Sequence, residues 1–343
     1  NIFIGMTNME NDTQKEVTFF EKFKEASWEF TYGSDKDMER NIVQVGLTAL
    51  FYIDECWRPE KREALANAVE RFIDEFGDKL KWGFIDDVNK PEKFVIKDKL
   101  TRIKRLADLE DDAAELQWCS EYYRDFVSNY QVNAFSPAGW YEHVHRRVSY
   151  IRFFLPITEL ADENANKFEQ LILDFCNILK PMHGVAGLGT QQLYNGNMYQ
   201  FIECDIARHF NGIDVTTSVT DRGLRDGIRS INWYTILSDE WVNKIGGEAY
   251  LKQQFMNDDI HLLPYQGGIV IKAGEWPELG WVERDLYPKL YVKVNHVLKP
   301  IRTPSFKSFH LGSISGEIRL DERLTKEWQE RFDSEGEKLD RQE

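Results

Sequence analysis

Three stretches of the chain repeat one order of patterns: an apolar run rich in β-formers, apolar residues at helical spacing, and a second apolar run. The first unit has a strand at 43–53, a helix at 60–76 and a short strand at 81–85. Pro59 suits the first turn of this helix and Gly77 suits its end. Its apolar positions recur three or four residues apart, the spacing of one helix face: Leu65, Ala68, Val69, Phe72, Ile73 and Phe76.

Two further units have the same order, with strand, helix and strand at 149–157, 168–179 and 183–188, and at 231–237, 239–255 and 268–273. Ser238 and Asp239 provide an N-cap signal for the last helix. Parallel strands need helical crossovers of this kind. The pattern therefore predicts an α/β (α+β) fold with a mixed β-sheet built from βαβ-like units and helices packed on it. We expect Phe72, Phe153 and Trp233 to lie in its core.

The chain has 343 residues, a length that suits two domains or one large one. We divide it into an N-terminal segment at 1–40, a first α/β subdomain at 41–135, a second at 136–320 and a charged tail at 321–343. The first six residues lack the basic and apolar regions of a secretory signal, and Met6 is a candidate native start. The longest apolar run, 43–53, is too short to span a membrane. These features predict a soluble, cytoplasmic protein.

The net charge of −15 gives the molecule a field that repels phosphate backbones and favours basic partners. This argues against direct binding of nucleic acid or anionic membranes. Acidic balance also serves solubility alone in many proteins.

The four cysteines, Cys56, Cys119, Cys176 and Cys204, form no CxxC pair, which argues against a zinc knuckle or a thioredoxin-type motif. Cys56, Cys176 and Cys204 have apolar neighbours. We expect reduced thiols packed in the core.

Two glycine-containing segments resemble catalytic or nucleotide-binding motifs without matching them. Residues 184–189 read GxxGxG rather than GxGxxG, so we interpret these glycines as points of positive φ or of close backbone approach. In 312–316 Ile314 occupies the position that a nucleophilic serine must hold. The chain contains no GK[ST] phosphate loop and no HExxH.

The alternative to a binding protein is a metal-dependent or hydrolytic enzyme that uses His143, His145 or His183. In a strand, His143 and His145 would share one face and could bind a metal, although Arg146 and Arg147 oppose a cation there. His183 could act as a general base, but no nucleophile or carboxylate forms a recognisable motif with it. We expect satisfied polar histidines and no catalytic residue, cofactor or metal.

Two acidic segments are candidates for contact with a basic partner. The first contains Asp108, Glu110, Asp111, Asp112 and Glu115, and a solvated surface is the ordinary interpretation of such a run. The second combines carboxylates with large rings, a composition suited to an interface, although one tryptophan is expected to be buried: Glu275, Trp276, Glu278 and Trp281.

Several segments, in order over residues 40–305, resemble the TsiV-like type VI secretion immunity family, formerly a domain of unknown function. They are Val45 to Phe76, Tyr150 to Pro156, Lys180 to Gly187, Ile231 to Leu237, Ile245 to Gly247, Ile269 to Gly274 and Tyr291 to Arg302. These positions are apolar strands, turns and glycines, so they define a scaffold and not a site.

The resemblance implies a cytoplasmic immunity protein that binds and neutralises a cognate toxin. Because toxins paired with the family include nucleases with a VRR-Nuc core, it implies a basic nuclease as the partner. An acidic protein could occlude the cationic groove of such an enzyme. The resemblance implies no enzymatic activity and no cofactor.

Overall fold

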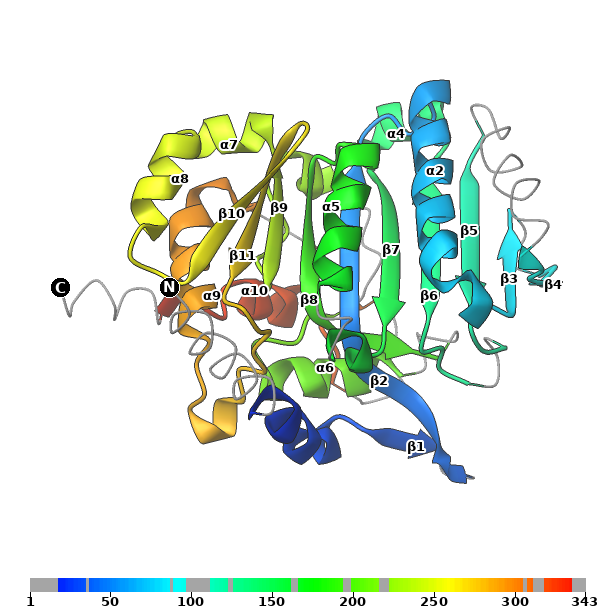
Figure 1. Ribbon diagram of the computed structural model, residues 1–343, viewed down its shortest axis with the longest axis horizontal. Helices are drawn as coiled ribbons and strands as arrows, with labels where there is room; N and C mark the ends of the chain where they lie inside the picture. Colours follow the sequence, from blue (N-terminus) through cyan, green and yellow to red (C-terminus); the bar gives the residue numbers. More distant parts are fainter. Residues whose placement is uncertain are drawn as a thin grey trace, which may run out of the picture.

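The structure is a computed structural model that describes residues 18–34, 37–86, 89–96, 112–122, 126–161, 166–193, 199–215, 222–304, 307–310 and 318–334. One eleven-stranded sheet runs through these residues in the order β10-β11-β9-β8-β2-β7-β6-β5-β3-β4, with β1 paired to the outer part of β2 (Figure 1). The strands are β1 (Tyr32–Ser34), β2 (Asp37–Ile53), β3 (Trp82–Ile85), β4 (Glu92–Lys93), β5 (Ala114–Cys119), β6 (Gln131–Ser136), β7 (Ser149–Leu155), β8 (His183–Gln192), β9 (Tyr234–Ser238), β10 (Ile260–Tyr265) and β11 (Gly268–Ala273).

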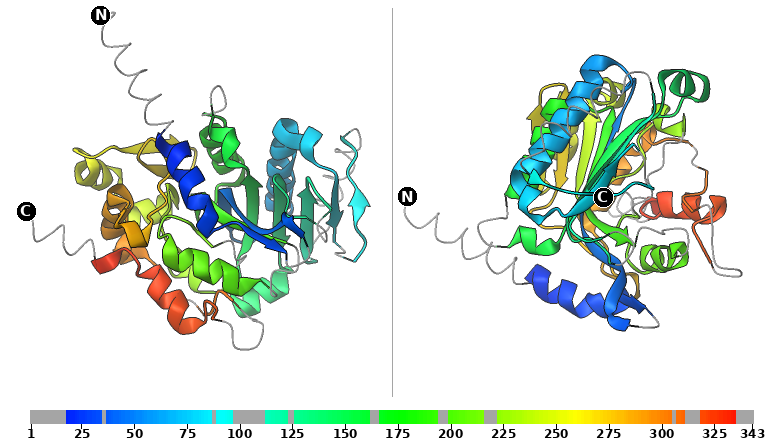
Figure 2. Two further views of the ribbon diagram at one scale, coloured as in Figure 1. Left: turned by 90° about the horizontal axis from the view of Figure 1, so that it is seen from below. Right: turned by 90° about the vertical axis from the view of Figure 1, so that its right-hand side faces the viewer.

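Helices cover both faces of this sheet. The α-helices are residues 18–26, α2 (Pro59–Phe76), α4 (Gly139–His145), α5 (Lys167–Leu179), α6 (Gln200–His209), α7 (Asp239–Ile245), α8 (Glu248–Phe255), α9 (Lys289–Leu298) and α10 (Glu322–Gln329). Short 3₁₀ turns are η1 (Ser27–Glu29), η2 (Gly77–Lys79), η4 (Ile157–Leu160), η7 (Arg222–Arg225), η8 (Val282–Arg284) and η9 (Lys299–Ile301). In Figures 1 and 2, α2 and α5 lie side by side on one face, and α6 and α10 lie on the other.

The α+β class and the helices packed on the sheet are confirmed, but the predicted mixed sheet is wrong. Every pair of neighbouring strands in the described residues is antiparallel. The helical crossover from β7 to β8 through α5 does connect two parallel strands. These strands are not neighbours, however, because β2 lies between them and is antiparallel to both. Sequence order does not reveal an inserted strand, and this caused the error.

The third unit contains a strand that the sequence pattern missed. β10 lies at the edge of the sheet and contains Pro264. Its buried and exposed residues do not alternate regularly, since only Ile260 and Tyr265, at its two ends, are buried. Proline is tolerated at sheet edges but weakens a sequence-based strand prediction. As a result β9 and β11 are antiparallel neighbours, and β10 is the strand that runs parallel to β9.

The central strand β2 contributes side chains to two apolar layers, one on each face of the sheet, because successive side chains point to opposite faces. Phe51 packs on Phe175 of α5, with ring centroids 5.3 Å apart. Leu50 and Tyr52 belong to a second cluster that includes Trp328 of α10. The predicted core positions are confirmed, since all three side chains are buried: Phe72, Phe153 and Trp233.

The glycines of 184–189 lie in β8, where the backbone approaches its neighbours closely. A Cβ on Gly184 would lie 2.4 Å from the Leu50 carbonyl oxygen. Gly187 adopts a φ of +154° and packs against the Asn232 side chain. The interpretation of these glycines as packing positions is therefore confirmed.

The four cysteines are free and buried, as expected. Burial raises the pKa of the Cys56 and Cys119 thiols to about 11, which leaves them protonated and unreactive at neutral pH. Among the described residues, no helix has both the length and the apolar character needed to cross a bilayer. The continuous sheet takes strands from both 41–135 and 136–320, and the division into subdomains stays a prediction.

Candidate functional site

His143 and His145 lie in the short helix α4, not in the strand in which they would share one face. Residues two apart in a helix point about 200° apart around its axis. Both side chains are exposed, and they do not share a face. The residue that α4 buries is Glu142, whose Oε1 accepts hydrogen bonds from the Glu55 backbone N–H at 2.5 Å and from Arg225.

His183 is a core residue on β8. Its Nε2 lies 2.7 Å from the Leu224 carbonyl oxygen in η7, and its ring contacts Tyr52 at a centroid distance of 5.2 Å. Burial lowers the pKa of His183 to about 4, so the imidazole is neutral at neutral pH. Because 1% of its surface is exposed, a substrate cannot reach it in this structure.

A cluster of buried polar residues surrounds Glu203 of α6, on the face of the sheet opposite α2 and α5 (Figure 1). Glu203 Oε1 is 2.8 Å from His310 Nε2, and its other oxygen accepts a hydrogen bond from the Thr190 hydroxyl. His310 Nδ1 accepts a hydrogen bond from the Leu320 backbone N–H at 3.0 Å, so Nε2 is the atom that donates to Glu203. Burial alone would raise the pKa of Glu203, but hydrogen bonds from its neighbours outweigh burial and lower the pKa to about 2.

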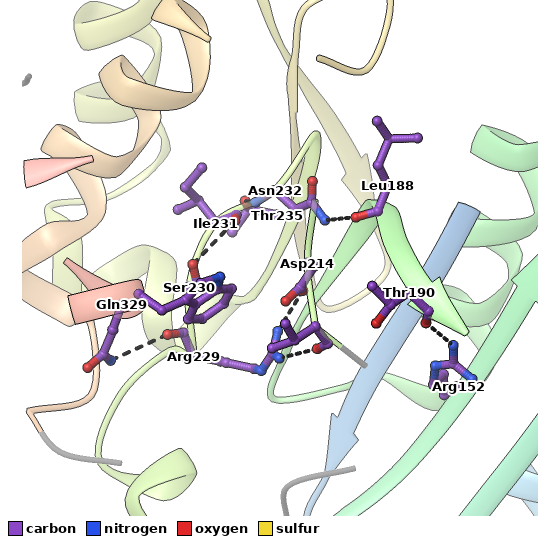
Figure 3. A network of polar contacts seen from close by, with 12 residues as sticks. Arg152, Leu188, Thr190, Asp214, Arg229, Ser230, Ile231, Asn232, Thr235 and Gln329 are labelled. Atoms are coloured by element: carbon purple, nitrogen blue, oxygen red, sulfur yellow. Dashed lines mark hydrogen bonds and ion pairs between the residues drawn. The ribbon is translucent and has the colours of Figure 1, made fainter. Parts of the chain in front are cut away.

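A second part of this polar layer surrounds Arg229 (Figure 3). Arg229 donates to Asp214 Oδ2 at 2.6 Å and to the Val215 carbonyl oxygen at 2.7 Å. Its guanidinium also lies over the rings of Phe309 and Trp328. Arg229 therefore connects residues 214–215, which follow α6, to Trp328 of α10.

Within this layer, Glu203 resembles a catalytic group only in its lowered pKa. Glu203 and His310 are fully buried, and 1% of Arg229 is exposed. They connect α6, β8, 307–310 and α10 through hydrogen bonds and ring contacts, so we assign them a structural role. No sequence motif marked them, because each is a single polar residue far along the chain from its partner.

The predicted acidic run is only partly within the described residues. Asp108, Glu110 and Asp111 lie outside them. Asp112 and Glu115 are exposed, and Glu115 begins the polar alternation of β5. β5 lies near the β4 end of the sheet, far in strand order from the Glu275 to Trp281 segment after β11, so the structure does not bring the two candidate segments together.

The segment from Glu275 to Trp281 leaves β11 through Gly274, whose φ is +90°. The Gly274 N–H donates to the Asp259 carbonyl oxygen at 2.9 Å, and its own carbonyl accepts from the Trp233 indole at 2.8 Å. Further along, the Glu278 N–H donates to the Tyr291 hydroxyl oxygen at 3.0 Å. These bonds fix the segment against the core.

The two tryptophans of this segment differ in burial. Trp281 is buried and packs on Phe210, with ring centroids 5.4 Å apart. Trp276 is half-buried and stacks on Phe19 of the helix at 18–26 at 5.7 Å. Trp276 is therefore the ring of this pair that a partner can reach.

Trp276 lines a pocket of about 330 Å³ between the start of β10, the end of β11 and the helix at 18–26. Its main apolar walls are Phe19, Trp276, Leu279, Leu286, Tyr287 and Leu290. Three exposed acidic residues also line it: Asp259, Glu275 and Glu278. Three of the four residues predicted in this segment line the pocket, Trp281 does not, and their contact with a partner stays a prediction; Phe19, Lys22 and Asp259 are lining residues that the sequence did not single out.

The rim carboxylates differ in their partners. His261 Nε2 lies 2.9 Å from Asp259 Oδ1 and 3.2 Å from Glu275 Oε1. Within the described residues these three form a group of potential metal ligands, all exposed. Both carboxylates have the histidine as a partner, and Glu275 also has Lys272, so we assign no metal to them.

Glu278 lies on the other part of the rim. The pocket walls withdraw its carboxyl from water enough to raise its pKa, although the residue is exposed overall, and Lys22 acts in the opposite direction. In the part of the chain that the structure describes, no side chain pairs directly with this carboxylate. A cation entering the pocket would therefore meet a carboxylate that is partly desolvated and available.

The fold and the site together define an antiparallel α+β protein with an acid-rimmed aromatic pocket suited to binding. A family model described as type VI immunity for VRR-NUC matches residues 64–332. The chain belongs to this family, TsiV, and the resemblance seen in the sequence is confirmed.

A solved structure, the Pseudomonas aeruginosa T6SS protein PA0821, has the same fold, with a TM-score of 0.80. It is 23% identical, and the match covers 90% of this chain and 90% of that one. No curated protein sequence matched the chain.

Proposed function

We propose that this protein binds a cognate VRR-NUC-type nuclease toxin of a type VI secretion system and neutralises it by covering its active site or substrate groove. The family match over residues 64–332 carries the proposal. The net charge of −15 supports it, because a nuclease presents a cationic groove to its substrate. The protein acts as a stoichiometric inhibitor in the cytoplasm, where the toxin meets nucleic acid, and needs no turnover and no cofactor.

The enzyme alternative loses its geometric basis. His143 and His145 lie on different sides of α4, and His183 is buried against Leu224. A direct inhibitor and an enzyme that inactivates the toxin predict different dose curves. An inhibitor acts at once and saturates at one equivalent, whereas an enzyme acts below one equivalent and increasingly with time.

The experiment titrates this protein into the VRR-NUC protein encoded beside its gene and follows DNA cleavage. We expect cleavage to end near a 1:1 ratio, and co-purification of the two proteins from mixed lysates. Undiminished cleavage at a large excess would contradict the proposal. Time-dependent inactivation at a tenth of an equivalent would favour the enzyme.

A double substitution, His143→Ala with His145→Ala, tests the metal form of the alternative. Because both side chains are exposed and share no face, we expect the variant to melt like the parent and to protect equally well. Loss of inhibition by a folded variant, together with stoichiometric zinc in the parent protein, would instead support a metal-dependent role.

A further inference from the structure

We propose that the pocket beside Trp276 binds a single arginine or lysine side chain of the nuclease, and that Glu278 is its main charged partner. This rests on the proposed function and assigns to it one contact and the chemistry of that contact.

The size and walls of the pocket suit one long side chain. Its volume, about 330 Å³, is at the lower end of the range of small-ligand sites. Leu286 and Leu290 can pack along the aliphatic stem of a lysine or arginine. Trp276, stacked on Phe19 on one side, and Tyr287 also line the pocket, and an aromatic ring attracts a cationic head group that lies over its open face.

The net negative charge at the rim of the pocket favours a positively charged side chain. The pocket lining contains one cationic residue, Lys22, and three carboxylates: Asp259, Glu275 and Glu278. A phosphate or carboxylate would be repelled here. A neutral apolar guest would remove water from Glu278 without replacing its hydrogen bonds, which is unfavourable.

Among the three carboxylates, Glu278 is the one that lacks a direct partner among the described residues. Asp259 and Glu275 pair with His261, and Glu275 also lies 3.4 Å from Lys272 Nζ. The Glu278 backbone N–H donates to the Tyr291 hydroxyl oxygen. The Glu278 backbone carbonyl packs so closely on Gly212 that a Cβ at position 212 would lie 1.9 Å from the carbonyl oxygen. The site is therefore held in place before a partner arrives, which lowers the entropic cost of binding.

The test compares Glu278→Gln and Trp276→Leu with a matched control, Glu240→Gln, in binding to an inactive form of the neighbouring VRR-NUC protein. Glu240 lies on α7, pairs with Lys244 and is exposed. Because a short-range contact of this kind affects dissociation, we expect each pocket variant to dissociate about tenfold faster or more, with little change in association. The control should change either rate constant less than about twofold.

A charge exchange identifies the guest. Single alanine substitutions of the basic residues of the nuclease should reveal one whose effect vanishes in the Glu278→Gln background, as a double-mutant cycle requires for direct contact. Glu278→Arg should then bind a nuclease in which that residue is glutamate better than it binds the parent nuclease. Melting curves verify that each variant is folded.

The outcomes separate this assignment from the proposed function. If the parent protein fails to bind the nuclease, the proposed function is wrong. If the parent binds and both folded pocket variants dissociate at the control rate, the function stands and the pocket assignment is overturned. Binding abolished by a chelator and restored by zinc would overturn it in favour of a metal bridge at Asp259, His261 and Glu275.

Discussion

At the scale of single residues, Phe153 shows how the core of the α2 and α5 face is assembled. Its ring lies near four other phenylalanine rings from β2, α2 and α5, with centroid distances between 5.1 and 6.2 Å: Phe51, Phe72, Phe168 and Phe175. The side chain is fully buried. Its removal would leave a cavity that rings from three elements cannot all close.

We therefore expect Phe153→Ala to lower the free energy of unfolding by about 3–5 kcal/mol. Urea denaturation followed by fluorescence measures this value. Trp28→Ala is the control, because its side chain is 89% exposed and surface changes of this kind alter stability by about 0.5 kcal/mol or less. Equal midpoints for the two variants would show that the packing around Phe153 is misassigned.

At the scale of elements, His183 connects β8 to η7 through the Leu224 carbonyl. Its pKa falls from about 6.5 in the unfolded chain to about 4 in the folded protein, mainly because of burial. Between these values the unfolded chain binds more protons than the folded one, so stability falls as the pH falls. The pKa of Glu203, near 2, produces a similar loss only below about pH 4.5.

Burial raises the pKa of three carboxyls, which therefore oppose this loss of stability in the same interval: Glu115, Glu142 and Glu278. The difference between the parent and a His183 variant between pH 4.5 and 6.5 isolates the contribution of His183. We expect the free energy of unfolding to decrease there by up to about 1.4 kcal/mol per pH unit. In His183→Gln, whose amide can still donate to Leu224, this slope should diminish, whereas the exposed His145→Gln should retain it. A slope that survives in His183→Gln would place its origin elsewhere.

At the scale of the whole molecule, the net charge of −15 acts at distances longer than any contact. Such a field accelerates the encounter with a cationic partner. It is screened as the Debye length shortens from ~10 Å at 0.1 M salt to ~3 Å at 1 M. Long-range attraction thus affects association, while the pocket at Trp276 affects dissociation.

We expect the association rate constant with the VRR-NUC protein to fall steeply as salt rises, in stopped-flow measurements across this range. Charge reversal at Asp112 and Glu115, compared with reversal at Glu240 and Glu248, tests whether the β5 end also faces the partner. Slower association only for the first pair would place that end near the nuclease, and equal rates would place it away. A rate constant that does not change with salt would exclude electrostatic steering and leave apolar contacts as the basis of recognition.

The sequence by itself determined what depends on neighbours along the chain. The spacing from Leu65 to Phe76 gave α2 to within one residue of its start at Pro59, because helical periodicity is local. It also identified the central strands, the buried thiols and the family, while the acidic and aromatic segment from Glu275 to Trp281 stays a prediction of partner contact. Each of these depends on residues that are close in sequence or on the order of segments.

Only the tertiary structure decided which strands are neighbours, which faces helices cover and which distant residues meet. Glu142 of α4 is held by Arg225, a partner 83 residues away that no local pattern contains. Phe19 and Trp276, which both line the pocket, lie far apart in the sequence and pack on each other only in the folded chain. Local sequence determines backbone conformation over a few residues. Contacts between residues distant in sequence depend instead on how the whole sheet buries its two faces.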